Sequence, residues 1–163
     1  MLGRLLRFAR TSRRDPKLVL LALRVYFLLV LSRVVITVLP MRRITGHLGE
    51  PMVETPLTAV HPSVEDFAHR VGVAIRKIAP ATPTESNCYP QALTAWWLLH
   101  RKGAPTTFYF GAAFERGKPD LAAHVWLRCG TQIVTGGRAG VRFQALTYYA
   151  DFGRTSREVG RKA

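Results

Sequence analysis

Cysteine is scarce in this chain of 163 residues, which contains only Cys88 and Cys129. Two cysteines do not make a disulfide framework, and no small-residue cleavage site of the secretory type follows an apolar segment. We therefore expect a reducing, cytoplasmic setting, with association with a membrane as the alternative. The separation of the two cysteines matches no compact zinc spacing, so we expect no metal site.

Acidic residues are also few, because ten Asp and Glu face 24 Lys and Arg, which gives a formal net charge of +14. Residues 1–43 contribute +9 of this charge and contain a single acid, Asp15. A basic segment favours polyanions such as nucleic acid, an anionic membrane surface or an acidic protein. Gly-rich phosphate loops and aromatic RNA-binding motifs are missing, so we expect no nucleic-acid partner. Contact of residues 1–43 with a membrane surface or an acidic partner stays open.

A long apolar run occupies residues 17–40, and its length suits a membrane span of about 20 residues. It is interrupted by Arg24 and Arg33, which lie about 180° apart around a helix that turns 100° per residue. Each arginine would cost about 2.5–3.5 kcal/mol near the centre of a bilayer. We therefore favour a helix that packs on the rest of the protein or on a partner, or that lies on a membrane surface, over a true span.

Residues 40–62 contain four prolines and two glycines without sustained periodicity, so we predict an irregular connector. After it, Ser63 and Asp66 resemble a capping box at the start of a helix with one apolar face. We divide the chain accordingly into a basic N-terminal segment, residues 1–62, and a domain formed by residues 63–163.

A second helix is predicted to begin near Asn87, with Cys88 in its first turn. Ser86 or Asn87 can cap it, and Pro90 is tolerated in the first turn, where its missing N–H would have no intrahelical partner. Gly103 is predicted to end this helix.

The hydrophobic pattern changes beyond Pro105 to period two and short apolar runs. Four segments are predicted to be antiparallel strands joined by hairpins: TTFYFGAAF, AAHVWLRCG, TQIVTGG and FQALTYYADF. Helices followed by an antiparallel sheet make an α+β fold.

The position of Cys88 makes it a candidate nucleophile. Unpaired N–H groups and the positive end of the helix dipole favour a thiolate at a helix start, and the Cys88 backbone N–H is the natural oxyanion donor. A thiolate that attacks an amide also needs a base that later protonates the leaving amine, a role that suits histidine.

His124 is the histidine that best fits this role, because it lies in the apolar strand AAHVWL. A histidine in such a strand is otherwise a satisfied interior side chain, but its pairing with a cysteine at a helix start favours a dyad. The other four histidines are predicted to be solvated surface residues: His47, His61, His69 and His100.

The acceptor that would orient His124 is left open by the sequence. The strand expected opposite the histidine, residues 132–136, contains no acid. We rank Thr135 and Asp120 equally as the third member. The other candidates are the Gln132 amide, Asp151 and a backbone carbonyl.

Strand alternation places Trp126 on the same face as His124, where it either lines a substrate cleft or packs in the core. Cys129 falls on the other face, beside Gly130, with no helix start or neighbouring base. We predict that Cys129 is a buried structural thiol.

The segment from Asn87 to about Gly137 resembles the transglutaminase-like cysteine peptidases of lasso-peptide biosynthesis, the B proteins that remove the leader from the precursor peptide. The features that carry the resemblance are a cysteine that opens a helix before QAL, a basic helix end before Gly-x-Pro, a YFG strand, AHVWL and a closing VTGG. A basic start, a long apolar helix, MRRI and a Pro-containing connector are typical of the stand-alone peptidase half of split B proteins.

This resemblance implies a papain-like or transglutaminase-like core with Cys88 as nucleophile and His124 as base. Many relatives carry an aspartate where this chain has Thr135. The resemblance also implies three partners: the lasso precursor peptide, a separate small leader-recognition protein and a cyclase resembling asparagine synthetase. Some relatives depend on ATP, but we assign no nucleotide site and expect no cofactor for the chemistry.

Two other functions stay open. The same fold could perform acyl transfer, such as transglutamination or amidation. A non-enzymatic basic protein associated with a membrane or nucleic acid is the other alternative.

Overall fold

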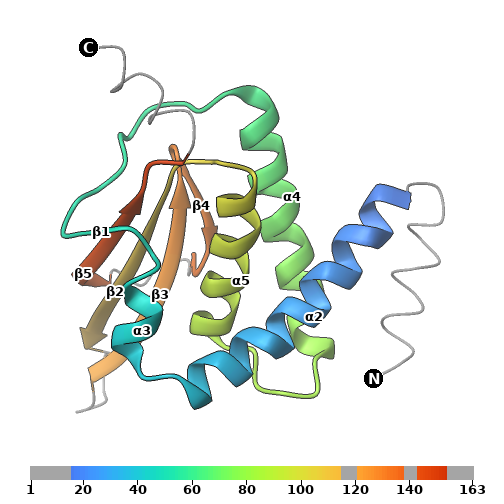
Figure 1. Ribbon diagram of the computed structural model, residues 1–163, viewed down its shortest axis with the longest axis horizontal. Coiled ribbons are helices and arrows are strands. Elements are labelled where there is room, and N and C mark those ends of the chain that lie inside the picture. The colour runs from blue at the N-terminus through green and yellow to red at the C-terminus, as the bar shows by residue number, and fades with distance from the viewer. Residues whose placement is uncertain (1–15, 115–120, 138–142, 154–163) are drawn as a thin grey trace.

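The computed structural model of the chain describes residues 16–114, 121–137 and 143–153. Helices α4 (Pro62–Ile78) and α5 (Cys88–Arg101) pack on one face of an antiparallel sheet, and α2 (Pro16–Val38) crosses them on the outside (Figure 1). The five strands are arranged in the order β1-β5-β2-β3-β4. Their bounds are β1 (Glu50–Pro51), β2 (Thr106–Phe114), β3 (Leu121–Cys129), β4 (Gln132–Thr135) and β5 (Gln144–Asp151). The predicted α+β class is confirmed.

Helix α2 is apolar on nearly every side, yet only one side of it is buried. That side contacts α4 and α5 and includes Val25 and Leu29, both fully buried. Ser32 is also buried there, and its hydroxyl lies 3.1 Å from the hydroxyl of Thr94 on α5. Within the described residues, α2 is the one helix whose length and composition would suit a membrane span.

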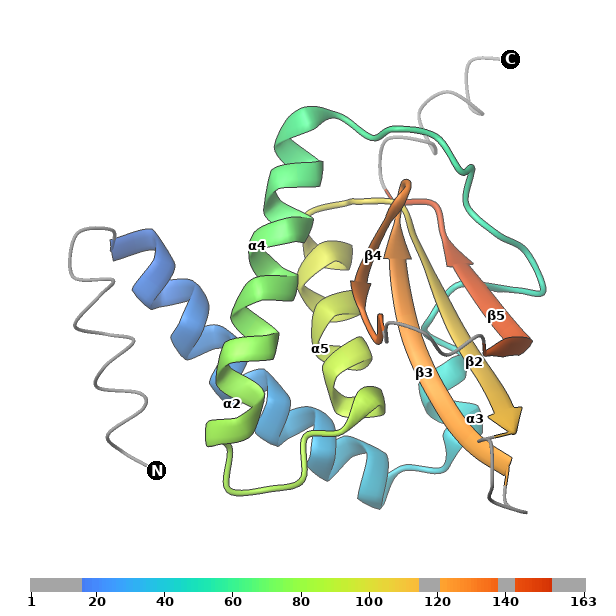
Figure 2. The same ribbon diagram turned by 180° about the vertical axis from the view of Figure 1, so that it is seen from behind.

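The connector between α2 and α4 is more ordered than its prolines predict. It contains the short helix α3 (Met41–Thr45) and β1, which pairs with β5. The connector then follows the side of the sheet away from α4 and α5 (Figure 2). There the hydroxyl of Thr55 lies 2.8 Å from that of Thr107 on β2. The prediction of a wholly irregular connector is therefore wrong, because tertiary contacts order a segment that lacks local periodicity.

The helix ends agree only in part with the sequence. The N-cap of α4 is His61, whose Nδ1 accepts a hydrogen bond from the Ser63 N–H at 3.3 Å, so the predicted capping box is wrong. Helix α5 begins at Cys88 as predicted, with Asn87 as the N-cap residue, although the Asn87 side chain makes no capping bond. Gly103 has a φ of +70°, a left-handed conformation typical of the residue that ends a helix.

The four predicted strands are all present, but one prediction about their connection fails. β5 does not pair with β4; it returns to the other side of β2, where Phe108 lies opposite Tyr149. The backbone N–H and C=O groups on both edges of the largely buried strand β2 need hydrogen-bond partners. β3 pairs with one edge and β5 pairs with the other.

The two faces of the sheet carry different side chains. Phe108, Val125 and Leu127 belong to the core that α5 covers. Strand alternation turns Tyr109 and Trp126 to the other face, where their rings stack.

Cys129 is 2% exposed, so the prediction of a buried thiol is confirmed. Burial raises its pKa from the ordinary value of 9.0 to about 11, against a smaller lowering effect of the Arg128 charge.

Candidate active site

Cys88 is the first residue of α5 and is partly buried against the hydrophobic core. Its neighbour Tyr89 fixes the start of the helix, because the Tyr89 ring contacts Phe108 at 6.2 Å and Phe110 at 5.4 Å between centroids. The N–H groups of a first helical turn have no intrahelical acceptor. The thiol therefore lies where main-chain donors and the helix dipole stabilise negative charge.

His124 is buried in β3 and donates a hydrogen bond to the main chain. Its Nε2 lies 2.6 Å from the carbonyl oxygen of Gly136. A carbonyl only accepts, so Nε2 carries the hydrogen and Nδ1 of the neutral ring holds the lone pair. The ring also stacks on Phe143, with 4.2 Å between centroids. This tautomer is the one in which Nδ1 can act as a base.

The Gly136 carbonyl is the hydrogen-bond acceptor for His124 Nε2, the role for which Thr135 and Asp120 were the leading candidates. Thr135 is buried, and its hydroxyl has no hydrogen-bond partner among the described residues, so it is not the acceptor for Nε2. Asp120 lies outside the described residues. A backbone carbonyl was among the alternatives that the sequence left open.

The two remaining candidate acceptors lie elsewhere. The carboxylate of Asp151 is 2.6 Å from Nδ1 of His100, so this acid and this histidine form a pair with each other. Because of that pair, the description of His100 as merely solvated is incomplete. The Gln132 amide faces His69 at 3.4 Å.

Gly136 has a backbone conformation that other residues rarely adopt, with a φ of +79°. A Cβ at this position would lie 2.5 Å from the Cβ of Trp126 and 2.6 Å from the carbonyl oxygen of Val125. This tight approach fixes the carbonyl that holds His124. The sequence signal for this conformation is the glycine pair in VTGG, which follows the strand expected opposite His124.

No hydrogen bond joins Cys88 to His124 in the described part of the chain. Tyr89 contacts Phe110, and Phe110 lies opposite Val125, the neighbour of His124. Alternation directs His124 to the face that α5 does not cover. Cys88 therefore packs on the core side of the sheet, and His124 lies on the opposite face.

β4 pairs with β3 only at Leu127, Arg128 and Cys129, so the described ladder stops before it reaches His124.

A family model for the transglutaminase-like superfamily matches residues 29–147. The chain belongs to the transglutaminase-like superfamily. The matched region runs from the middle of α2 into β5 and includes Cys88 and His124. The membership supports an enzyme of the cysteine-peptidase or acyltransferase type. Comparison with curated proteins and with solved structures gives no match.

Trp126 packs as a structural residue of this transglutaminase-like sheet. Its ring stacks on Tyr109 with 5.0 Å between centroids and 7° between planes. The ring also covers Gly111, where an added Cβ would lie 2.7 Å from it. The alternative that Trp126 lines a substrate cleft is compatible with its partial exposure and stays a proposal.

Arg128 is a buried residue that the sequence did not single out, and it ties the connector to the transglutaminase-like core. It is 4% exposed. Its Nε donates to the Tyr109 hydroxyl at 2.9 Å, and its terminal nitrogens donate to further groups: Glu54 Oε2 at 3.2 Å, the Thr55 carbonyl at 2.8 Å, the Thr107 hydroxyl at 3.0 Å and the Gly130 carbonyl at 2.7 Å. Burial raises the pKa of Tyr109, partly offset by its hydrogen bond from Arg128.

A cavity of about 1500 Å³ lies between α2, α3 and the C-terminal half of α5. Trp96 lines it, and the His100 ring stacks on Trp96 with 5.1 Å between centroids. Neither Cys88 nor His124 lines this cavity. We place the candidate chemistry at the dyad and not here, because the superfamily reaction needs a nucleophile.

The described residues contain no group of three or more His, Cys, Asp and Glu side chains that could hold a metal ion.

Proposed function

We propose that this protein is a cysteine peptidase that removes the leader peptide from a lasso-peptide precursor before macrocyclisation. The observation that carries the proposal is the superfamily match across both Cys88 and His124, together with Cys88 as the first residue of α5. The resemblance of residues 87–137 to B proteins supplies the substrate class.

In the proposed reaction, His124 Nδ1 takes the thiol proton and the Cys88 sulfur attacks the carbonyl carbon of the leader–core amide. The Cys88 backbone N–H donates to the oxyanion of the tetrahedral intermediate. His124 then returns the proton to the departing amine of the core peptide, which leaves a thioester between the leader and Cys88. Water activated by His124 hydrolyses the thioester, so the leader acid is released and the thiol restored.

The Gly136 carbonyl supports these steps by holding the Nε2–H of His124. It keeps the ring in the tautomer with a basic Nδ1 and stays bonded when the ring is charged. The proposed chemistry requires the Cys88 thiol and Nδ1 of His124 to come within hydrogen-bond reach of each other. Catalytic hydrogen bonds often form only when substrate binds.

We further propose that a separate small leader-recognition protein presents the precursor and that an asparagine-synthetase-like cyclase closes the ring. The B-protein resemblance is the support for both partners. We assign no ATP site, and the proposed hydrolysis needs no cofactor. The proposed reactions take place in the cytoplasm.

The proposal is tested by leader cleavage in vitro with precursor and recognition protein. Cys88→Ala should abolish cleavage, because the sulfur forms the covalent intermediate, while Cys129→Ala should retain it. Mass spectrometry of the products measures both. His124→Ala should lose cleavage and also slow alkylation of Cys88 by iodoacetamide. Full activity of Cys88→Ala would contradict the assignment.

Acyl transfer is the second candidate function, because the superfamily match supports both reaction types. In that case an amine, and not water, would resolve the thioester. A mixed leader–amine product formed when an amine is supplied, in place of the free leader acid, would decide for it. A function retained in Cys88→Ala would instead favour a non-enzymatic basic protein.

A further inference from the structure

The outer side of α2 carries a row of exposed apolar side chains, which we call the outer stripe. Phe27 is 67% exposed and Val38 is 71% exposed. The stripe consists of Leu20, Leu23, Phe27, Leu31, Val34 and Val38. Its residues follow one another at intervals of three or four, so at 100° per residue they fall within an arc of about 80° and extend over about 27 Å of helix. Contiguous apolar surface of this kind marks an interaction site.

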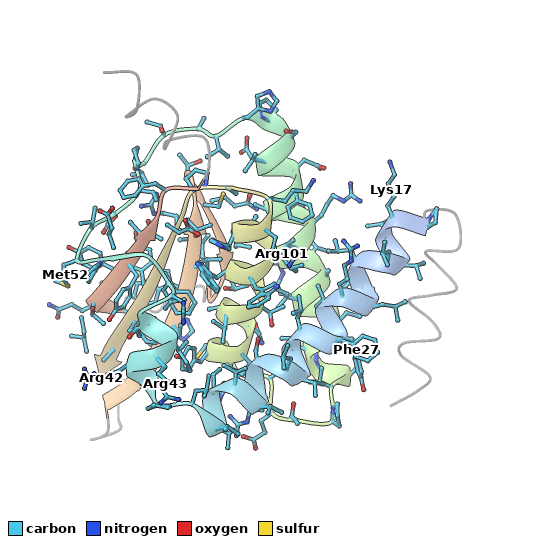
Figure 3. All side chains as sticks on the ribbon, viewed as in Figure 1. Lys17, Phe27, Arg42, Arg43, Met52 and Arg101 are labelled. Carbon is cyan, nitrogen blue, oxygen red and sulfur yellow. The ribbon has the colours of Figure 1, made fainter. Side chains whose placement is uncertain are left out.

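Packing inside the molecule explains why the stripe faces outward. The opposite side of α2 is held on α5 by Val25 and Leu29, which are fully buried, and by the buried Ser32–Thr94 hydrogen bond. Figure 3 shows Phe27 projecting from α2 away from the sheet. The stripe is therefore surface that the fold leaves uncovered.

The charged side chains that α2 and α3 themselves contribute are all basic. The sequence contains no acidic residue from position 16 to position 49. Arg24 is exposed and lies about 60° from the centre of the stripe, whereas Arg33 is half-buried and lies about 120° from that centre on the other side. Arg42 and Arg43 are exposed on α3, just after the C-terminal end of α2 (Figure 3). An apolar helix face bordered by arginines is the pattern of a helix that lies in the interface of an anionic membrane.

We propose that α2 attaches this protein to an anionic membrane surface, with the outer stripe in the acyl boundary and the exposed Arg24, Arg42 and Arg43 on lipid phosphates. A second copy of the chain fits less well, because a self-complementary contact between two stripes would bring Arg24 of each copy close to the other basic helix. A true span would require α2 to leave the core and to break the Ser32–Thr94 bond. The inference is independent of the proposed peptidase activity.

The test is cosedimentation of the full-length protein with vesicles of phosphatidylcholine, with and without phosphatidylglycerol. We expect binding to the vesicles that contain phosphatidylglycerol, weaker binding to phosphatidylcholine alone, and loss of binding as salt is raised. Equal binding to both vesicle types without dependence on salt would overturn the role of the arginines.

Matched variants locate the contact. Leu23→Glu, within the stripe, should weaken vesicle binding by about tenfold or more, because it removes apolar area and adds a negative charge. Leu57→Glu makes the same change at a 70% exposed leucine of the connector and should bind as the wild type. Circular dichroism checks that both variants stay folded, and both positions are exposed enough to tolerate the change.

Three results would overturn the proposal. These are vesicle binding by Leu23→Glu equal to that of the wild type, absence of binding by the wild type, and a wild-type dimer in ultracentrifugation that Leu23→Glu disrupts while vesicles are not bound. Leader cleavage without lipid should be unaffected by Leu23→Glu. A failure of membrane binding is therefore distinguishable from a failure of the proposed peptidase function.

Discussion

At the scale of single residues, a main-chain group holds the candidate base. The Nε2 of His124 donates to the Gly136 carbonyl, and the preceding Thr135 does not take this role. A neutral carbonyl orients the ring as well as a carboxylate does, but it stabilises a charged imidazolium less, because hydrogen bonds to charged acceptors are stronger. The position of this carbonyl then depends on the backbone conformation of Gly136.

Gly136→Ala should lower kcat/KM for leader cleavage by about 100-fold, because small displacements of a catalytic group cost on that order. The new Cβ would overlap Trp126 and the Val125 carbonyl, and the φ of +79° is strained for alanine. The pH–rate profile should shift as well, since Gly136 acts through His124. Gly137→Ala is the matched control, because its Cβ would meet only an ordinary contact of 3.6 Å. Equal loss in both variants would argue against the positioning role.

Burial of the Cys129 thiol predicts a pH dependence of stability. Its pKa is 9.0 ordinarily and about 11 in the folded protein. As the pH rises above 9, the thiol ionises in the unfolded chain before it does so in the folded one, so the unfolded state is favoured. The free energy of unfolding should therefore fall between about pH 9 and pH 11. Urea titrations across this range should show a shallower fall for Cys129→Ala, and identical slopes would contradict the prediction.

At the scale of elements, the connector is ordered by a few polar contacts with the sheet and not by its own sequence. Arg128 of β3 reaches Glu54 and the Thr55 carbonyl, and Thr55 also bonds to Thr107. These contacts hold the connector against the face that carries His124. Order in this segment therefore depends on one buried side chain from a strand far along the chain.

Replacement of Arg128 by methionine should lower the free energy of unfolding by about 3–5 kcal/mol, because it leaves several buried acceptors without a donor. Glu54→Gln should cost about 0–1 kcal/mol, since the Glu54 side chain is 48% exposed. Chemical denaturation measures both values. Similar small costs for the two variants would show that Arg128 does not hold the connector.

At the scale of the whole molecule, α2 joins the same hydrophobic core as α4 and α5, and the superfamily match begins within this helix. Its inner side belongs to the core, and its outer side belongs to the surface proposed to meet the membrane. The two sides of α2 therefore have different roles, which its nearly uniform hydrophobicity does not distinguish.

Two leucines of α2 test this division by the same substitution. Leu29 is fully buried, so Leu29→Ala should cost about 2–5 kcal/mol of stability. Leu20 is 49% exposed, and Leu20→Ala should stay within about 0.5 kcal/mol of the wild type. Thermal or urea denaturation measures the change in the free energy of unfolding for both variants. Equal effects would mean that α2 does not pack on α4 and α5 as described.

The sequence by itself determined the local features: α5 begins at Cys88, β2 and β3 lie where the alternation predicts, and Cys129 is buried. Helix starts, glycine stops and hydrophobic periods depend on neighbouring residues, so they can be read without the fold.

Only the tertiary structure decided which residues and strands are neighbours in space. It placed Gly136 at His124, Asp151 at His100, β5 beside β2 and Arg128 under the connector. The contacts of Arg128 with the connector join residues that are up to 74 positions apart. No local pattern encodes these contacts. Each buried polar group needs a hydrogen-bond partner, and which partner lies within reach is set only when the hydrophobic core has formed.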